Sequence, residues 1–174
     1  MNTIRRQLTL FIDEPSGSIE KIRAEFNPIQ YQLIPAHVTL CREDEIEPID
    51  KTIKRIESIV LKKPIGITFG KAKRFANGNG VYMNSIDNNN DFNNLRKLIL
   101  GQSELEKTQI PHITLMHPRN STCTNDLFEK IGNYKLPTEL SFAKISLIQQ
   151  INGGKWSVLQ EFNIVKNTKS QLGL

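Results

Sequence analysis

Cysteine is scarce in this chain, and so are the patterns in which it binds a metal or forms a crosslink. Only two of the 174 residues are cysteines, Cys41 and Cys123, and neither belongs to a CxxC pair or another spaced metal motif. Two cysteines do not provide the framework of a disulfide-stabilised secreted domain. We therefore expect reduced thiols and a cytoplasmic protein.

Long hydrophobic runs are missing as well. The apolar stretch near the N-terminus, residues 8–12, stops at Asp13 and is too short for the core of a signal peptide. No segment approaches the roughly 20 apolar residues that span a bilayer. The sequence therefore predicts no association with a membrane.

The composition suits one folded domain. Hydrophobic residues make up 38% of the chain and charged residues 24%, which excludes general disorder. Lysine and arginine number 23 against 18 acidic residues, a net charge of +5. This balance favours an anionic partner such as a nucleotide or RNA, although many domains of similar charge have no such partner. We expect a monomer with a single domain over residues 1–174.

Histidine is rare too, but two of the three histidines begin the same four-residue pattern. Residues 37–40 read His-Val-Thr-Leu, and residues 112–115 read His-Ile-Thr-Leu. The probability that a second histidine is followed by such a triplet by chance is well under about 1% at ordinary residue frequencies. The repeat is therefore the strongest functional signal in the sequence.

Strand and helix signals alternate along the rest of the chain. Strands are expected over residues 4–12, 37–42, 65–75, 81–86, 111–116, 139–150 and 155–165. Helices are expected from Ser16 or Ser18 to about Phe26, from Glu47 to Lys62, from Phe92 to Gly101 and from Thr122 to Lys130. Asn27-Pro28 should end the first helix, and residues 76–80 should form a tight turn.

The two halves of the chain have the same order of elements. Strand, helix, motif strand, helix and strand begin at residue 4 and again at residue 81, and the motif histidines lie 75 residues apart. We interpret this as an internal duplication of an α+β unit, with lobes at approximately residues 4–75 and 81–165 that can exchange strands. In such a pseudo-twofold pair, equivalent strands can face each other across one cleft. That arrangement would bring His37 and His112 together.

Strand alternation divides each motif into two pairs of side chains. His37 and Thr39 point to one face, about 7 Å apart, while the two apolar residues anchor the strand to a core. His112 and Thr114 repeat this arrangement. Two imidazoles can act as general base and general acid in one turnover, and two hydroxyls can donate to phosphate oxygens. Together they suit in-line attack at phosphorus, a scheme that needs no metal.

Zinc binding is the alternative for these histidines. It would combine His37, His112 and His117 with Cys41 or Cys123. The spacing of His112 and His117 fits no standard zinc signature, and a strand would turn these two side chains to opposite faces. We therefore expect neither a metal nor another cofactor.

The paired motifs, their spacing and the duplicated unit resemble the 2H phosphoesterase superfamily, over roughly residues 4–165. That family is named for two His-x-Thr/Ser-x motifs and includes 2′-5′ RNA ligase-like proteins and RNA 2′,3′-cyclic phosphodiesterases. The resemblance implies an α+β, bilobal fold with two antiparallel sheets around a central cleft and helices outside. It implies catalysis by His37 and His112 and phosphate contacts from Thr39 and Thr114.

Four other residues are candidates for substrate binding. Arg42 follows the first motif and Arg119 the second, and their positive guanidinium groups could bind a phosphate. Phe75 and Tyr82 are aromatic residues that could stack on a base. The alternatives are a solvated surface position for each arginine and core packing for each aromatic ring.

Three functions remain open from the sequence. The first is a metal-independent phosphoesterase that opens 2′,3′-cyclic phosphates on RNA or nucleotides. The second is a 2′-5′ phosphodiester ligase or hydrolase, or an ADP-ribose cyclic phosphodiesterase, of the same fold. The third is a non-catalytic module that binds nucleotides or RNA. Intact histidine and threonine in both copies favour an enzyme, because binding alone needs no acid–base pair.

Overall fold

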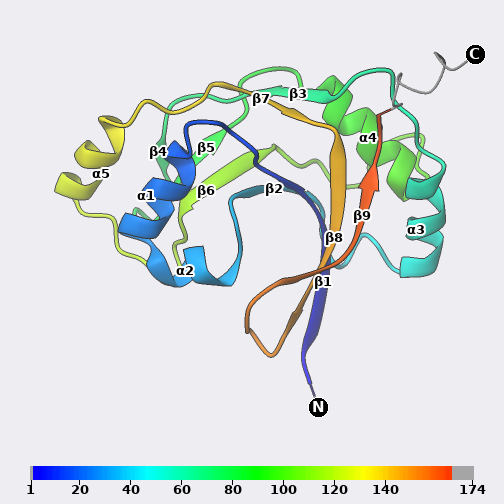
Figure 1. Ribbon diagram of the computed structural model, residues 1–174, viewed down its shortest axis with the longest axis horizontal. Helices are drawn as coiled ribbons and strands as arrows, with labels where there is room; N and C mark the ends of the chain where they lie inside the picture. The colour runs from blue at the N-terminus through cyan, green and yellow to red at the C-terminus, as the bar shows by residue number, and fades with distance from the viewer. Residues whose placement is uncertain (1, 166–174) are drawn as a thin grey trace, which may run out of the picture.

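The computed structural model describes residues 2–165 of the chain (Figure 1). Its helices are α1 (Ser18–Phe26), α2 (Pro28–Leu33), α3 (Ile49–Glu57), α4 (Asn90–Leu100) and α5 (Asn125–Gly132). Its strands are β1 (Ile4–Phe11), β2 (His37–Cys41), β3 (Ile65–Thr68), β4 (Lys73–Arg74), β5 (Val81–Asn84), β6 (His112–Met116), β7 (Glu139–Phe142), β8 (Lys144–Ile151) and β9 (Ser157–Asn163). Within these residues, every helix is too short or too polar to cross a bilayer.

The two motif strands lie next to each other in the middle of a seven-stranded antiparallel sheet. The strand order is β4-β5-β6-β2-β1-β8-β9, so β2 and β6 are neighbours, and β1 and β5 flank them on either side. The strands β2 and β6 pair through Val38 and Ile113. The sheet therefore brings together two motifs that are far apart in the sequence.

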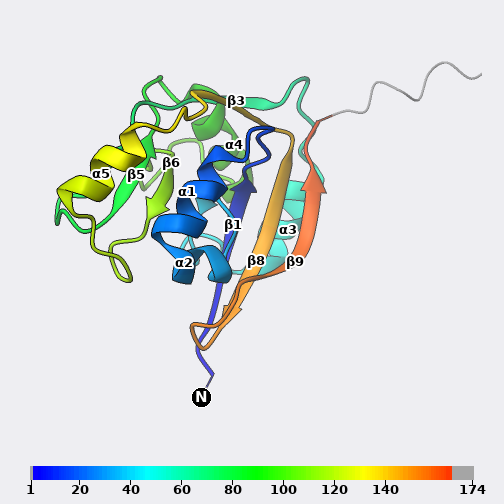
Figure 2. The ribbon, with the colours of Figure 1, turned by 60° about the vertical axis from the view of Figure 1, so that its left-hand side comes forward.

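A second, two-stranded sheet is formed by β3 and β7, which pair antiparallel from Ile65 with Phe142 to Thr68 with Glu139. In the view of Figure 1, α1, α2 and α5 lie at the left of the molecule and α3 and α4 at the right, and Figure 2 shows α1, α2 and α5 together again. The helix α1 contacts β6, and α4 contacts β2. Each motif strand is thus packed against a helix from the other half. The α+β class with antiparallel sheets is confirmed.

The core explains why the motif strands hold their orientation. Val38 and Leu40 in β2, and Ile113 and Leu115 in β6, are each at most 1% exposed and belong to one continuous hydrophobic cluster. Full burial of such a side chain stabilises the fold by about 1.5–3 kcal/mol. A shift of either strand by one residue would turn these groups to solvent, so the hydrophobic pattern fixes which face carries the polar side chains.

The strand connections are compatible with the duplication hypothesis and with strand exchange. The strand β4 belongs to the first half but pairs with β5, while β8 belongs to the second half but pairs with β1. The large sheet therefore runs through both halves without interruption. This continuity supports the interpretation of one domain built from two interlocked lobes.

Four points differ from the expectations from the sequence. Asn27-Pro28 ends the first helix as expected, but Pro28 then starts the short helix α2, which was not predicted and in which proline fits the first turn. The strand expected over residues 65–75 is two strands, β3 and β4, in different sheets. The strand expected over residues 139–150 likewise divides into β7 and β8. Hydrophobic alternation does not reveal a change of sheet, because each piece alternates correctly on its own.

The fourth correction concerns the helix expected from Glu47 to Lys62. It begins at Ile49 and ends at Glu57, and Val60 lies outside it with 55% of its surface exposed. The helical spacing of Ile49, Ile53, Ile56 and Val60 predicts one buried stripe, which in the structure stops at Ile56. Helix ends are set by local capping and packing, which an apolar periodicity alone does not specify.

Candidate active site

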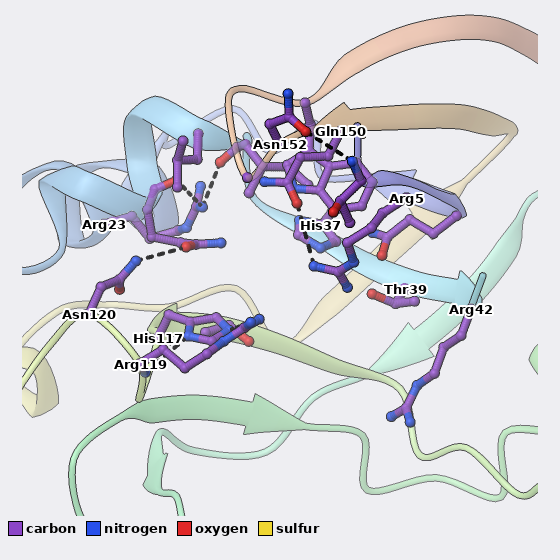
Figure 3. Close-up of a pocket in the computed structure, with 18 of the residues that line it drawn as sticks. Arg5, Arg23, His37, Thr39, Arg42, His117, Arg119, Asn120, Gln150 and Asn152 are labelled. Atoms are coloured by element: carbon purple, nitrogen blue, oxygen red, sulfur yellow. Dashed lines mark hydrogen bonds between the residues drawn. The ribbon is translucent and has the colours of Figure 1, made fainter. Parts of the chain in front are cut away.

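His37, Thr39, His112 and Thr114 all line one pocket of about 830 Å³. In each motif the histidine and threonine are half-buried while the residues between and after them are fully buried. This is the alternation expected of a strand with one face on the core. Figure 3 shows the pocket, with Arg5, Gln150 and Asn152 on one side and His117, Arg119 and Asn120 on the other.

The register between the motif strands predicts which of these groups are neighbours. Val38 pairs with Ile113 in an antiparallel ladder. Continuing that register by one residue in each direction places His37 opposite Thr114 and Thr39 opposite His112. Side chains that lie opposite each other share a face of the sheet, with Cβ atoms roughly 5 Å apart. Each histidine is therefore expected to lie beside the threonine of the other motif.

Both imidazole rings are oriented by the same backbone contact. His37 Nδ1 lies 2.9 Å from the carbonyl oxygen of Pro35, and His112 Nδ1 lies 3.2 Å from that of Ile110. A carbonyl oxygen only accepts, so each Nδ1 carries a proton and donates it. In the neutral ring the lone pair is then on Nε2, the atom available for proton transfer.

The pKa of each motif histidine is lowered. Burial is the main cause of the fall in the pKa of His37 from 6.5 to about 4, and the positive charges of Arg23, His112 and His117 add to it. Burial also lowers the pKa of His112, with a further contribution from Arg42. In the free protein both rings are therefore neutral near pH 7. A bound anion opposes these effects, because it stabilises the imidazolium form.

A buried arginine fixes the segment that leads into the first motif. Arg23 is 2% exposed and pairs with Glu20, with Nη1 and Oε2 2.6 Å apart. Its Nη2 donates to the carbonyl oxygen of Ile34 at 2.6 Å, and Glu20 accepts from the backbone N–H of Ala36 at 2.5 Å. The segment just before His37 is thus anchored to α1.

A second buried arginine has a similar role for the other motif. Arg96 donates from Nη1 to the Leu40 carbonyl oxygen at 2.5 Å and to Gln109 Oε1 at 3.0 Å. Gln109 in turn donates from Nε2 to the Thr39 carbonyl oxygen at 2.5 Å. This network joins the strand of the first motif to the segment just before His112. The relative position of the two motifs is therefore held by hydrogen bonds as well as by the core.

The pocket is positively charged. Arg5, Arg23, Arg42 and Arg119 line it, and within the described residues no aspartate or glutamate does. Arg42 lies close enough to His112 to lower its pKa, and Arg119 Nη2 lies 3.4 Å from Nε2 of His117. Both arginines proposed from the sequence are thus at the pocket. An anionic ligand is favoured there by charge alone.

The two aromatic candidates lie beside the pocket rather than in its lining. Phe75 and Tyr82 stack on each other with ring centroids 4.4 Å apart, and Tyr82 meets His112 edge-on at 6.1 Å. Phe11 packs on His37 in a similar way, at 6.4 Å. These contacts support the imidazole rings. Tyr82 pairs with Thr114 in the β5–β6 ladder, so its ring flanks His112 on the polar face of the sheet, with Phe75 on its other side.

Several residues in and around the pocket were not found from the sequence, although some left a signal. Arg23 follows Ile19 and Ile22 at helical spacing, so it occupies a position in an otherwise apolar stripe. Arg96 has the same relation to Phe92 and Leu95. A charged residue on the buried face of a helix indicates a specific partner.

The other pocket residues left weaker signals. Arg5 and Gln7 lie two residues apart on one face of β1, but Arg6 between them is half-buried like both of them, so alternation marks this polar face only weakly. Trp156 lies in the β8–β9 hairpin, and the sequence around it does not predict that it reaches the pocket.

The zinc alternative finds no cluster to support it. Between residues 2 and 165, no three His, Cys, Asp or Glu side chains are grouped so that they could hold a metal ion. Cys41 and Cys123 are buried and line no part of the pocket.

The whole architecture can be compared with known proteins. A family model described as the 2′-5′ RNA ligase superfamily matches residues 11–154, well over half of the chain. The chain belongs to this superfamily. The resemblance to 2H phosphoesterases seen in the two motifs is thereby confirmed at the level of the family.

Relatives in the 2′-5′ RNA ligase superfamily agree with this assignment. A protein of Bacillus cereus (strain G9842) that is named as a candidate phosphoesterase is 23% identical over 151 residues, which cover 83% of this chain and 87% of the relative. E. coli LigT, crystallised with 3′-AMP, has a TM-score of 0.57 at 16% identity, covering 94% of this chain and 99% of LigT. TT0787 of Thermus thermophilus has a TM-score of 0.57 at 15% identity, covering 92% and 97%. The solved structures share the fold.

Proposed function

We propose that this member of the superfamily opens 2′,3′-cyclic phosphates on RNA or nucleotides by general acid–base catalysis. The observation that supports this most directly is that both His-x-Thr motifs line one pocket and that both rings are held through Nδ1. Crystal structures of E. coli LigT with 3′-AMP and with ATP add support for a nucleotide ligand. The absence of acidic side chains from the pocket lining, within the described residues, agrees with a phosphate at this place.

The proposed reaction uses the two Nε2 atoms on opposite sides of the phosphorus. One neutral histidine accepts a proton from water as the water oxygen attacks phosphorus. The bond from phosphorus to the 2′ or the 3′ oxygen breaks, and that oxygen takes a proton from Nε2–H of the other histidine, which is charged. The two rings have then exchanged protonation states, and solvent restores them. Each proton transfer of this kind contributes about 10²–10⁴-fold to a rate.

The threonines and arginines have a different part in this proposal. Thr39 and Thr114 donate hydrogen bonds to the two non-bridging oxygens of the phosphate, where negative charge increases during attack. Arg42 and Arg119 supply positive charge at the pocket. They neutralise the phosphate and help to hold it between the rings.

Other phosphodiesters fit the same chemistry. A 2′-5′ linkage can be hydrolysed or formed by ligation, and an ADP-ribose cyclic phosphate can be opened. Each of these compounds offers the two histidines a phosphodiester phosphorus. A binding module without turnover would use the positive pocket but would not need the ring orientation found here. The four possibilities differ in which compounds are converted.

A substrate panel separates them. The purified protein is incubated with a chelator and, in turn, with 2′,3′-cyclic nucleotides, an oligonucleotide ending in a cyclic phosphate, 2′-5′-linked oligoadenylate and ADP-ribose cyclic phosphate. We expect ring opening of the first two. A preparation of the double variant His37→Ala/His112→Ala serves as the control for contaminating enzymes. Tight binding of the cyclic nucleotides with no conversion of any compound would contradict an enzyme and favour the binding module.

A further inference from the structure

The pocket is much larger than the phosphate site between the motifs. Its volume of about 830 Å³ lies in the range of sites that hold a whole small-molecule ligand. It extends from the motif histidines along β1 to the β8–β9 hairpin, where Arg5, Gln150, Asn152 and Trp156 line it. The hairpin and the start of β1 project together beyond the rest of the molecule (Figure 1). This arm of the pocket has room for a part of the substrate other than the phosphate.

The polar face of β1 connects the arm to the motifs. Thr9 pairs with Thr39 of the first motif, so the two side chains are on the same face of the sheet. Arg5 and Gln7 share that face because side chains alternate along a strand, and Gln150 lies opposite Arg5 on β8. A ligand whose phosphate lies at Thr39 can therefore follow this face toward the hairpin.

Trp156 is the one tryptophan of the chain, and core packing does not account for it. It is half-buried and belongs neither to the hydrophobic core cluster nor to the residues packed against that cluster. Its backbone N–H donates to the Leu33 carbonyl oxygen at 2.9 Å, which holds it at the end of α2. The guanidinium carbon of Arg5 lies 5.5 Å from the ring centroid. Trp156 and Arg5 thus place two flat groups together in a polar pocket.

The polar groups around this pair are already engaged. Arg5 Nε pairs with Glu43 at 3.1 Å, and its Nη1 donates to Gln150 Oε1 at 3.4 Å. Gln150 Nε2 donates to the Gly154 carbonyl oxygen at 2.8 Å. The ion pair makes Arg5 a weaker attractor of phosphate than Arg42. The amide group of Gln150 is used to hold the hairpin, which leaves flat surfaces rather than free hydrogen-bonding groups to recognise a ligand.

We propose that Trp156 and Arg5 form a nucleobase subsite, in which the base of a nucleotide stacks while its phosphate reaches the two His-x-Thr motifs. This rests on the proposed function, since it assumes a phosphate at the motifs. Stacking on an aromatic ring is tolerant of base identity because every base has a flat π surface. The subsite therefore binds purine and pyrimidine nucleotides with similar affinity.

Tryptophan fluorescence tests this without turnover, because Trp156 is the only tryptophan. The variant His37→Ala/His112→Ala is titrated with adenosine and uridine 2′,3′-cyclic phosphates, and with ribose 5-phosphate and inorganic phosphate as probes without a base. We expect both nucleotides to quench the emission, with dissociation constants within about fivefold of each other, and the two baseless probes to leave it unchanged. Nucleotide binding detected by calorimetry without any quenching would overturn the subsite.

Steady-state kinetics gives a second and separate test. Trp156→Ala is expected to raise KM for cyclic nucleotides about tenfold to hundredfold, with kcat within about threefold of the original. Trp156→Phe keeps a flat ring and should retain most of the affinity, which distinguishes stacking from a general loss of the hairpin. Leu159→Ala, on the exposed part of β9 and outside the pocket lining, is the matched control. An unchanged KM in Trp156→Ala would overturn the proposal.

The two proposals fail in different ways. If no compound is hydrolysed but nucleotides quench Trp156, the subsite stands and the catalytic proposal falls. If cyclic nucleotides are hydrolysed while Trp156→Ala has a normal KM and no nucleotide quenches, the catalytic proposal stands and the subsite falls.

Discussion

Val38 and Ile113 face each other across the junction of β2 and β6, and theirs is the one backbone pair that joins these strands in the described part of the chain. Each residue directly follows a motif histidine, and both side chains are 0% exposed. The contact that brings the two motifs together is therefore also part of the hydrophobic core. Site geometry and fold stability depend on the same few residues.

The first prediction concerns this core contact. Ile113→Ala should lower the free energy of unfolding by about 2–5 kcal/mol, because it removes buried apolar surface and leaves a cavity. Denaturant unfolding measures the change. Ile29→Ala, at a position 57% exposed on α2, should stay within about 0.5 kcal/mol of the original protein. Equal effects at both positions would contradict the assigned core.

The second prediction concerns the buried ion pair of Arg96 and Glu45, whose side chains are 0% and 8% exposed and whose Nη2 and Oε1 atoms lie 2.6 Å apart. Arg96→Met should destabilise the protein by about 3–5 kcal/mol, because it leaves a buried carboxylate without its partner. Glu45→Gln combined with Arg96→Met should cost less than the sum of the single changes. Strict additivity in a double-mutant cycle would show that the pair does not couple.

Both threonine hydroxyls are predicted to act on the transition state. Thr39→Val and Thr114→Val keep the side-chain shape but remove the donor, and each should lower kcat/KM about 10- to 100-fold, since a hydrogen bond to a charged group contributes about 1.5–3 kcal/mol. Thr68→Val, in the small sheet, is the matched substitution outside the pocket and should leave kcat/KM unchanged. Normal activity in both motif variants would remove the threonines from the mechanism.

The lowered histidine pKa values predict the pH dependence. The base must be neutral, so kcat/KM falls as pH drops through its pKa; the acid must be charged, so kcat/KM falls as pH rises through its pKa. The pKa of His37 is about 4 in the free protein and that of His112 also lies below 6.5. The pH profile of kcat/KM should therefore be bell-shaped, and its decline on the alkaline side should have its midpoint below pH 6.5.

The profile of kcat should lie at higher pH than that of kcat/KM, because the bound phosphate stabilises both imidazolium forms. Initial rates between pH 4 and 9 at low and saturating substrate give the two profiles. A kcat/KM that does not change between pH 5 and 8 would exclude general acid–base catalysis by this pair.

Much of the architecture follows from local patterns in the sequence. The two His-x-Thr motifs were expected on strands with Val38 and Ile113 turned inward, and the structure confirms both strands. This succeeds because alternation and burial depend only on neighbouring residues. The switch of sheets between β7 and β8 was missed, because pairing partners far away in the sequence decide it.

The extent of the site was harder to predict than its centre. Arg23 left a signal as a charge within an apolar helical stripe, but its partner at the Ile34 carbonyl is set by tertiary packing. Trp156 reaches the pocket only because the β8–β9 hairpin folds back toward α2, a contact that involves no sequence motif. Short-range patterns thus identify the catalytic candidates, and long-range folding decides what surrounds them.

The central claim is that His37 and His112 act as one acid–base unit, and the most direct measurement of it compares single and double variants. Hydrolysis of a 2′,3′-cyclic nucleotide is followed for the original protein, His37→Ala, His112→Ala and the double variant, with Lys130→Ala as a surface control. We predict that each single variant loses about as much kcat as the double variant, at least about 10²-fold, because the two proton transfers occur in one step. Retention of full kcat in either single variant would contradict the account.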